Sequence, residues 1–94
     1  MIKFEWDEAK SQACFQERGF DFEYAALAFF DPNRQVLQDS RRVYGEDRFQ
    51  LLGSIAGRVS VLVYTPRAGV FLIISTRKAN SREAEVYDRH AKAP

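Results

Sequence analysis

Apolar residues in the first third of the chain recur with the period of a helix. Asp7 can cap a helix that runs to about Arg18, where Gly19 provides a left-handed stop. Asp21 can cap a second helix, whose apolar residues follow the i, i+3, i+4, i+7 spacing of one buried face. These residues are Phe22, Ala25, Ala26, Phe29 and Phe30. Two helices are therefore predicted, after a short extended start at residues 2–5.

Beyond residue 33 the apolar positions follow the period of strands. Residues 70–76 are apolar on both faces, which predicts a central strand of the sheet. Within the preceding strand, Val59, Val61 and Val63 alternate on one face. Four strands are predicted, at residues 35–38, 48–55, 58–65 and 70–76, joined by a polar, basic loop at 39–45, a tight Ala56-Gly57 turn and a further turn at 66–69.

The charged segment that follows the most apolar strand predicts a final helix. This helix begins at about Ser81, because Asn80 can cap it and Glu83, three residues later, completes a capping box. The order of elements is then ααββββα with neighbouring strands antiparallel, which indicates an α+β fold. Two helices are expected on one side of a twisted sheet and the third at its end.

Length and composition restrict the class of protein. The chain has 94 residues, 46% of them hydrophobic, which fits one domain, 1–94, with a modest core. No segment approaches the roughly 20 apolar residues that cross a bilayer, and no apolar signal region follows the first charges, so a cytoplasmic protein without a membrane partner is predicted. A single cysteine, Cys14, excludes an internal disulfide and a cysteine-based metal cluster. Motifs of nucleotide-binding loops, zinc metalloproteases and serine hydrolases are absent from the sequence.

Charge is distributed unevenly along the chain. Residues 1–33 hold three Lys and Arg against seven Asp and Glu, a net charge of −4. Residues 34–94 hold eleven Lys and Arg against six Asp and Glu, a net charge of +5. The pattern suggests an acidic helical side and a basic side able to meet phosphates, although two ordinary solvated faces would give the same count.

Several of the basic residues lie at predicted strand ends and turns. Arg48 opens one strand, and antiparallel pairing brings it near Arg67 in the turn beyond the partner strand. Strict alternation places Arg77 on the same face as Ile73, with Lys78 on the opposite face. Guanidinium groups bind phosphate through a rigid fork of donors, so arginines on one rim could hold an RNA backbone. The alternative is that they only solubilise the sheet edges.

Four segments of the sequence resemble a known family of bacterial proteins. They are KFEWDEAK at 3–10, GEDRF at 45–49, GRVSVLVYT at 57–65 and IISTRKA at 73–79, followed by Glu83 and Tyr87. In order and spacing these segments are similar to the BrnT family of type II toxins. The resemblance implies a RelE-like fold and a ribonuclease that inhibits translation without a metal or other cofactor. It also implies a BrnA-like antitoxin whose ribbon-helix-helix domain binds DNA, so that operator DNA is met only through the antitoxin.

An RNA-cleaving member of such a family needs groups that stabilise charge at phosphorus and groups that position the RNA strand. It also needs a base for the ribose 2′-hydroxyl and an acid for the departing 5′-oxygen. Arg48, Arg67 and Arg77 match family positions and are assigned to charge stabilisation, with Lys78 assisting at a neighbouring phosphate. Candidates for proton transfer are Glu46, Glu83 and Tyr87. Candidates for RNA contact are Arg41, Arg42, Tyr44 and Arg58, with the aromatic ring available for base stacking.

Alternatives stay open for these assignments. Glu83 could serve only the capping box, and Tyr87 could serve only to pack on the sheet. The chain has Glu17-Arg18-Gly19 where family members commonly have Lys-His-Gly, and Leu72 where an arginine is frequent. The alternative function is a non-catalytic toxin homologue that binds an antitoxin and modulates its DNA binding.

Overall fold

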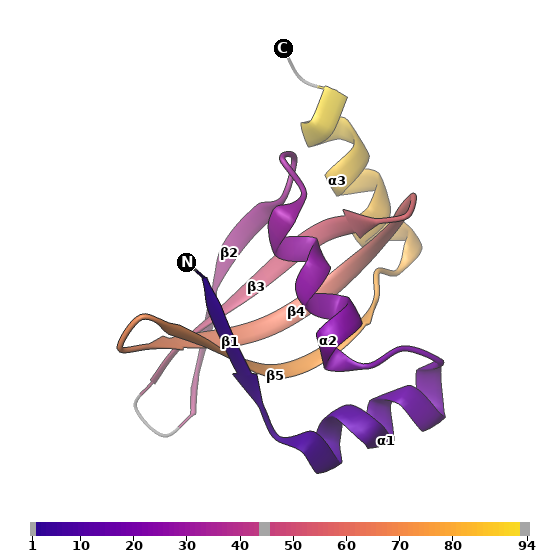
Figure 1. The fold of residues 1–94 in the computed structure, drawn as a ribbon. Coiled ribbons are helices and arrows are strands. Elements are labelled where there is room, and N and C mark those ends of the chain that lie inside the picture. The colour runs from indigo at the N-terminus through magenta and orange to yellow at the C-terminus, as the bar shows by residue number, and fades with distance from the viewer. Residues whose placement is uncertain (1, 44–45, 93–94) are drawn as a thin grey trace.

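The computed structural model describes residues 2–43 and 46–92, which form a five-stranded mixed sheet flanked by helices (Figure 1). The strands lie side by side in the order β1-β5-β4-β3-β2. Their bounds are β1 Lys3–Trp6, β2 Gln35–Val43, β3 Glu46–Ile55, β4 Arg58–Arg67 and β5 Val70–Lys78. The helices are α1 Glu8–Arg18, α2 Phe22–Ala25, the 3₁₀ helix η1 Ala26–Phe30 and α3 Ser81–Lys92.

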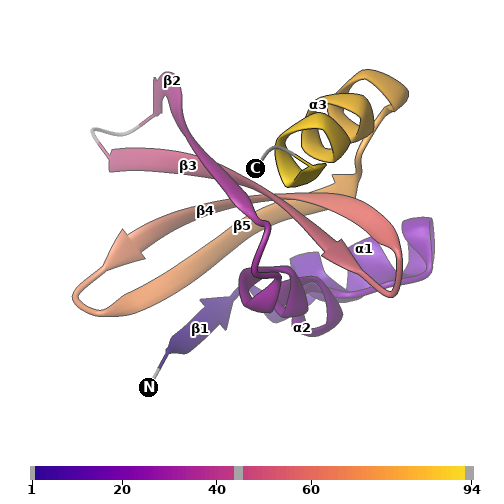
Figure 2. The same ribbon diagram turned by 90° about the horizontal axis from the view of Figure 1, so that it is seen from above.

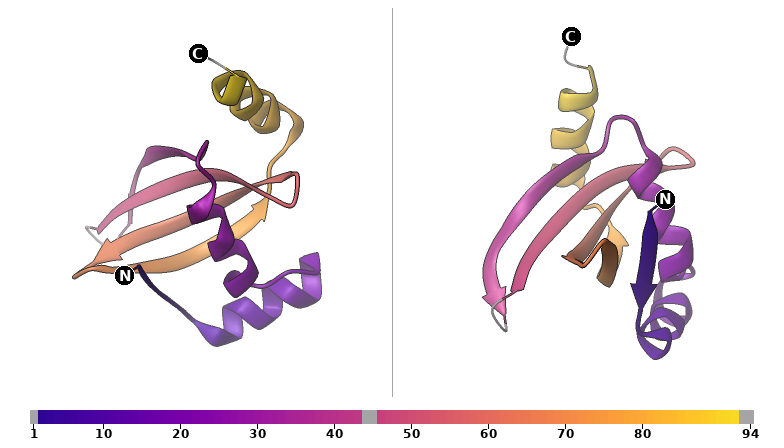
Figure 3. Two further views of the ribbon diagram at one scale, coloured as in Figure 1. Left: turned by 45° about the horizontal axis from the view of Figure 1, so that its top comes forward. Right: turned by 60° about the vertical axis from the view of Figure 1, so that its left-hand side comes forward.

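The helices divide between the two faces of the sheet. Helices α1, α2 and η1 lie against one face, which we call the covered face, whereas α3 packs on the other face near one end of the strands (Figure 2). The rest of that second face carries no helix of the described chain, and we call it the open face (Figure 3). The α+β class is thus confirmed, with α3 beside the sheet rather than in line with its end. None of the described helices is long and apolar enough to span a bilayer.

The predicted order omitted the first strand. Residues 2–5 were expected only to be a short extended start, whereas residues 3–6 form β1, which pairs in parallel with β5, with Phe4 opposite Phe71. The rings of Phe4 and Phe29 lie 4.9 Å apart, so the strand is held by aromatic packing across the covered face. Four residues are too few to show a period, and therefore the sequence pattern did not reveal a parallel strand.

Two predicted loops are shorter than expected. Strand β2 continues to Val43, through most of the predicted loop at 39–45, because pairing with β3 resumes at Val43 and Glu46 after an irregularity. Strand β4 includes Pro66 and Arg67, so the turn to β5 consists of Ala68 and Gly69. Both residues of this turn have positive φ, 46° and 83°, as do both residues of the correctly predicted Ala56-Gly57 turn.

The helix boundaries follow their caps. The Asp7 carboxylate accepts from the Lys10 N–H at 3.2 Å, Gly19 ends α1 with φ of 83°, and the Asp21 carboxylate accepts from the Tyr24 N–H. The predicted second helix is α-helical for one turn and then tightens into η1, which changes its periodicity. As a result Phe30 is 63% exposed, contrary to the prediction, while the other four predicted apolar residues are buried.

The main core lies between the covered face and the helices. Leu51 and Leu62 are fully buried there beside Phe29 and Tyr64. Gly53 of β3 permits a close approach of η1, since a Cβ at this position would lie 2.6 Å from the carbonyl oxygen of Ala28. A smaller cluster on the opposite face, formed by Leu52, Val61 and Tyr87, holds α3 on the sheet.

Candidate functional site

A β-bulge in β5 decides which face carries Arg77. Val63 pairs with Ser75 and Tyr64 pairs with Ile73, so Ile74 is an extra residue on β5. Arg77 consequently lies opposite Val61, which packs under α3 with Leu52 and Tyr87, and not on the face of Ile73. The predicted shared face of Arg77 and Ile73 is therefore wrong, because a bulge reverses the alternation that strict spacing assumes.

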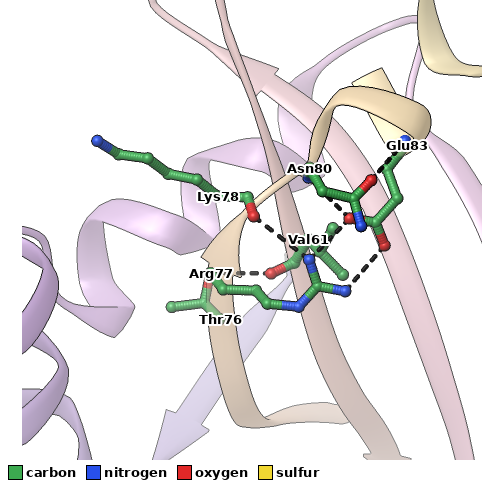
Figure 4. A network of polar contacts seen from close by, with 6 residues as sticks. All are labelled: Val61, Thr76, Arg77, Lys78, Asn80 and Glu83. Carbon is green, nitrogen blue, oxygen red and sulfur yellow. Dashed lines mark hydrogen bonds and ion pairs between the residues drawn. The ribbon is translucent and has the colours of Figure 1, made fainter. Parts of the chain in front are cut away.

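Arg77 forms a two-pronged ion pair with Glu83 at the start of α3. Its two terminal nitrogens donate to the two carboxylate oxygens at 2.7 and 2.8 Å (Figure 4). The same carboxylate accepts from the Asn80 N–H at 2.9 Å, while the Asn80 side chain accepts from the Glu83 N–H at 2.8 Å. The predicted capping box is thus confirmed, and it fixes the carboxylate that orients Arg77.

The ion pair keeps both of its members charged. Hydrogen bonding to Arg77 lowers the pKa of Glu83, with further lowering from the Asn80 N–H and opposition from burial. The pKa of Arg77 is raised mainly by its hydrogen bond to Glu83. At neutral pH the pair is therefore a carboxylate beside a guanidinium whose side chain is still 44% exposed. That exposure leaves Arg77 accessible to an anion.

Arg77 borders a hollow of about 190 Å³ on the open face. Arg18, at the C-terminal end of α1, also borders it, together with Gln50 of β3 and Ser75 of β5. The hollow thus combines two guanidinium groups with an amide and a hydroxyl, a set of hydrogen-bond donors suited to phosphate and ribose oxygens. Sequence reasoning missed Arg18, Gln50 and Ser75, since their approach depends on the bulge and on where α1 ends.

A second basic cluster lies toward the other end of the open face. Arg67 donates to Glu46 at 2.8 Å, and this hydrogen bond is the main cause of the lowered pKa of Glu46. Arg48 is on the neighbouring strand, where its charge further lowers the pKa of Glu46 and its buried Nε has no hydrogen-bond partner. The predicted proximity of Arg48 and Arg67 is therefore confirmed. Arg67 lies six positions along β4 from Val61, the residue opposite Arg77, which corresponds to a span of about 20 Å.

Lys78 and Arg58 lie on the other side of the sheet. As predicted, Lys78 points away from the face of Arg77, and it borders a hollow beside α1 and α2 that Arg58 also borders. These basic residues thus form three groups: Arg18 with Arg77, Arg48 with Arg67, and Arg58 with Lys78. A single phosphate cannot contact all three groups at once.

Tyr87 is buried under α3 and hydrogen-bonded. Its hydroxyl donates to Asp31, whose carboxylate also accepts from the Ser54 and Asn33 N–H groups at 2.7 and 2.9 Å. Burial, together with the hydrogen bond and the charge of Asp31, raises the pKa of Tyr87 to about 12. Burial alone would raise the pKa of Asp31, but the hydrogen bonds from Tyr87 and the two N–H groups lower it. The pair ties α3 to β3 and to the end of η1.

Other predicted contacts fall partly beyond the described structure. Tyr44 lies outside the described residues. Arg41 and Arg42 belong to β2, but their side chains lie outside the part that is described.

Among the described residues, no group of three or more His, Cys, Asp and Glu side chains is placed to hold a metal ion. Cys14 is buried, and burial raises the pKa of its thiol.

Comparison with known proteins gives one family. A search among curated proteins returns no match. The family model described as the ribonuclease toxin BrnT of type II toxin-antitoxin systems matches residues 6–83. This span begins at the end of β1 and ends at Glu83, so it includes β2 to β5 and both basic clusters of the open face. The chain therefore belongs to the BrnT family of ribonuclease toxins of type II toxin-antitoxin systems.

Proposed function

We propose that this chain is a metal-independent endoribonuclease with a RelE-like fold, which inhibits translation by cutting RNA on the open face of its sheet. The observation that carries the proposal is the hollow bordered by Arg18 and Arg77 on an accessible face. Family membership supports the reaction class, and the open face supplies the charges that the reaction needs. The second cluster, Arg48 and Arg67, would hold the flanking RNA backbone.

The guanidinium groups supply the main chemical effect. Attack by a ribose 2′-oxygen places additional negative charge on the phosphate in the transition state, and fixed donors aimed at that charge lower the barrier. Arg77 presents a planar fork that Glu83 holds in place. Arg18 approaches the same hollow from α1, so the two cations could contact different oxygens of one phosphate.

Proton transfer is assigned to Glu83 more readily than to the other candidates. Glu83 is ionised at neutral pH and lies beside Arg77, so it can accept a proton from the 2′-hydroxyl, although its lowered pKa makes it a weak base. Glu46 is bound to Arg67 at the other cluster. We leave Tyr87 out of the site because its hydroxyl is buried and already donates to Asp31.

Neutralisation and regulation complete the proposal. A type II toxin acts together with a protein antitoxin, and the family implies that partner. The partner in our proposal is a BrnA-like protein with a ribbon-helix-helix domain, and the complex of the two proteins would bind operator DNA through that domain. The cytoplasm, where mRNA and the antitoxin gene are found, is the proposed location.

Induced expression of the chain with growth and RNA integrity measured together tests this function. We expect growth arrest and RNA cleavage, and cleavage by the purified protein that persists in EDTA. Arg77→Ala should reduce the cleavage rate by about 100-fold, the effect of losing one transition-state donor. The matched control is Arg89→Ala, since Arg89 is exposed on α3 and pairs only with Glu85 among the described residues. Equal loss in both variants, or cleavage that EDTA abolishes, would contradict the proposed site and mechanism.

A second function has one specific observation in its favour. None of the three proton-transfer candidates has a pKa moved toward neutrality: hydrogen bonding lowers the pKa of Glu46 and Glu83, while burial raises that of Tyr87 to about 12. This is compatible with a non-catalytic homologue that only binds its antitoxin. Harmless expression and intact RNA, with antitoxin binding retained, would establish that function in place of cleavage.

A further inference from the structure

A broad hollow lies on the side of the sheet away from the proposed RNA site. It measures about 680 Å³ and is bordered by the end of α1, by α2 and η1, and by the turn between β3 and β4. We call it the helix groove. Its apolar lining includes Phe15, Tyr24 and Leu27, whose exposed fractions are 56%, 43% and 49%. Three large apolar side chains, each about half exposed around one groove, are more than scattered surface residues.

Cations form the strand-side rim of the helix groove. Arg58 opens β4 and Lys78 ends β5, and both border the groove. Within the described part of the chain, neither side chain makes a hydrogen bond or ion pair, in contrast to Arg67 and Arg77, which each hold a carboxylate. The groove therefore offers apolar surface beside positive charge that is not yet compensated.

The acidic residues of the groove lie on its helical side. Asp21 and Glu23 border it, but the Asp21 carboxylate already accepts the Tyr24 N–H as the cap of α2. The charge of the groove is thus polarised, with cations on the strand side and carboxylates at the start of α2. A complementary occupant would place carboxylates on the strand side and apolar side chains over the middle.

We propose that the helix groove is the binding site for the antitoxin, through a segment with apolar side chains and carboxylates that meet Arg58 and Lys78. The inference rests on the proposed function for the existence of this partner, and goes further by placing it on a surface. Apolar anchors surrounded by charged pairs are the usual composition of protein interfaces with high affinity.

Arg18 connects the helix groove with the proposed RNA site. It borders both hollows, and its side chain is 43% exposed with a contact to Glu17 at 3.3 Å. A carboxylate of the bound antitoxin could attract Arg18 toward the groove and away from the open face. Neutralisation would then remove one of the two guanidinium groups from the RNA site without covering it.

Two matched pairs of variants test the groove, using the purified chain and the protein encoded by the adjacent gene as the probe. Leu27→Asp is compared with Leu37→Asp, because Leu37 is 56% exposed on β2, outside the groove. Arg58→Glu is compared with Arg89→Glu on α3. Titration calorimetry at two salt concentrations gives the affinities, and circular dichroism confirms that each variant is folded. Leu27→Asp and Arg58→Glu should each weaken binding by at least about tenfold, with the controls near wild type.

The possible results separate the inference from the proposed function. If the adjacent protein does not bind the wild-type chain, the proposed pairing fails and the inference fails with it. If it binds wild type and Leu27→Asp equally well, or loses affinity for Leu37→Asp instead, only the groove assignment is overturned. The groove assignment is also overturned if Leu27→Asp dissociates a dimer of the chain in sedimentation, or if Arg58→Glu weakens RNA binding and leaves antitoxin binding unchanged.

Discussion

The two faces of the sheet use the same backbone for different purposes. On the covered face, the described side chains are mostly apolar and buried, and aromatic rings such as Phe29 and Tyr64 pack with centroids 4.9 Å apart. On the open face, Arg48 and Gln50 of β3 and Ser75 of β5 follow one another, and the exposed side chains of Arg67 and Arg77 lie toward opposite ends. Stability is concentrated on the covered face, and charge available for a ligand on the open face.

A contrast between burial and exposure also separates two pairs of a carboxylate with a hydrogen-bond donor, both formed by α3. Asp31 and Tyr87 are buried, 9% and 6% exposed, so their hydrogen bond forms out of water and joins three elements. Arg77 and Glu83 are partly exposed, and water competes with their pairing. We therefore expect substitutions at the first pair to change mainly the free energy of unfolding, and at the second pair mainly function.

The largest effect is expected where a helix approaches the covered face most closely. In Gly53→Ala the new Cβ would lie 2.6 Å from the Ala28 carbonyl oxygen, so η1 must shift and the core must repack. We predict a loss of about 3 kcal/mol in the free energy of unfolding, measured by urea denaturation. Ser75→Ala on the open face is the control and should cost less than about 0.5 kcal/mol. Similar losses in the two variants would mean that the faces do not differ in this way.

A smaller effect is expected from Tyr87→Phe. The substitution removes the one side-chain donor to the Asp31 carboxylate among the described residues and leaves that buried carboxylate with backbone N–H donors. We predict a loss of about 2 kcal/mol in the free energy of unfolding at pH 7. Tyr24→Phe is the matched control, since Tyr24 is 43% exposed, and it should be nearly neutral. If Tyr87→Phe left the free energy of unfolding unchanged, the hydrogen bond would add no stability beyond the packing of the ring.

The pH dependence of this difference follows from the directions of the two pKa shifts. The pKa of Asp31 is lower in the folded state, so its contribution is complete above the unfolded value of about 4 and is lost as pH falls further. The difference in the free energy of unfolding between wild type and Tyr87→Phe should therefore become smaller from pH 7 to pH 3. The pKa of Tyr87 is raised to about 12, so its contribution is complete below about 10 and is lost at higher pH. A gap that widens on acidification would contradict these assignments.

Much of the fold could be predicted because local signals were strong. The caps at Asp7, Asp21 and Asn80 and the Ala56-Gly57 turn depend on neighbouring residues, and all four are confirmed. Prediction from the sequence failed where pairing between strands that are far apart in the chain decides the structure. Strand β1 is defined by pairing with β5 more than sixty residues later, and β2 extends through a polar segment because β3 lies beside it.

The candidate site was predictable only in part, for the same reason. Antiparallel register is a simple rule, and it brought Arg48 and Arg67 together as expected. Arg77 was placed on the wrong face because an inserted residue, Ile74, leaves no distinct signal in an apolar strand. Nothing in the sequence pattern predicted the pairing of Asp31 with Tyr87, since the two residues are 56 positions apart. Arg18 reaches the open face from another element.

The smallest effect on stability is expected from Glu83→Gln, and its effect on RNA should have the opposite sign. The amide keeps an oxygen for the Asn80 N–H but loses the charge that pairs with Arg77, at a cost of about 0.5 kcal/mol in the free energy of unfolding. In this variant a phosphate can bind Arg77 without first displacing a charged carboxylate. Binding of an RNA analogue that lacks 2′-hydroxyl groups should therefore tighten by roughly threefold in fluorescence anisotropy. Weaker binding would instead show that a bound phosphate gains more from the orientation that Glu83 gives to Arg77 than it loses by competing with the carboxylate.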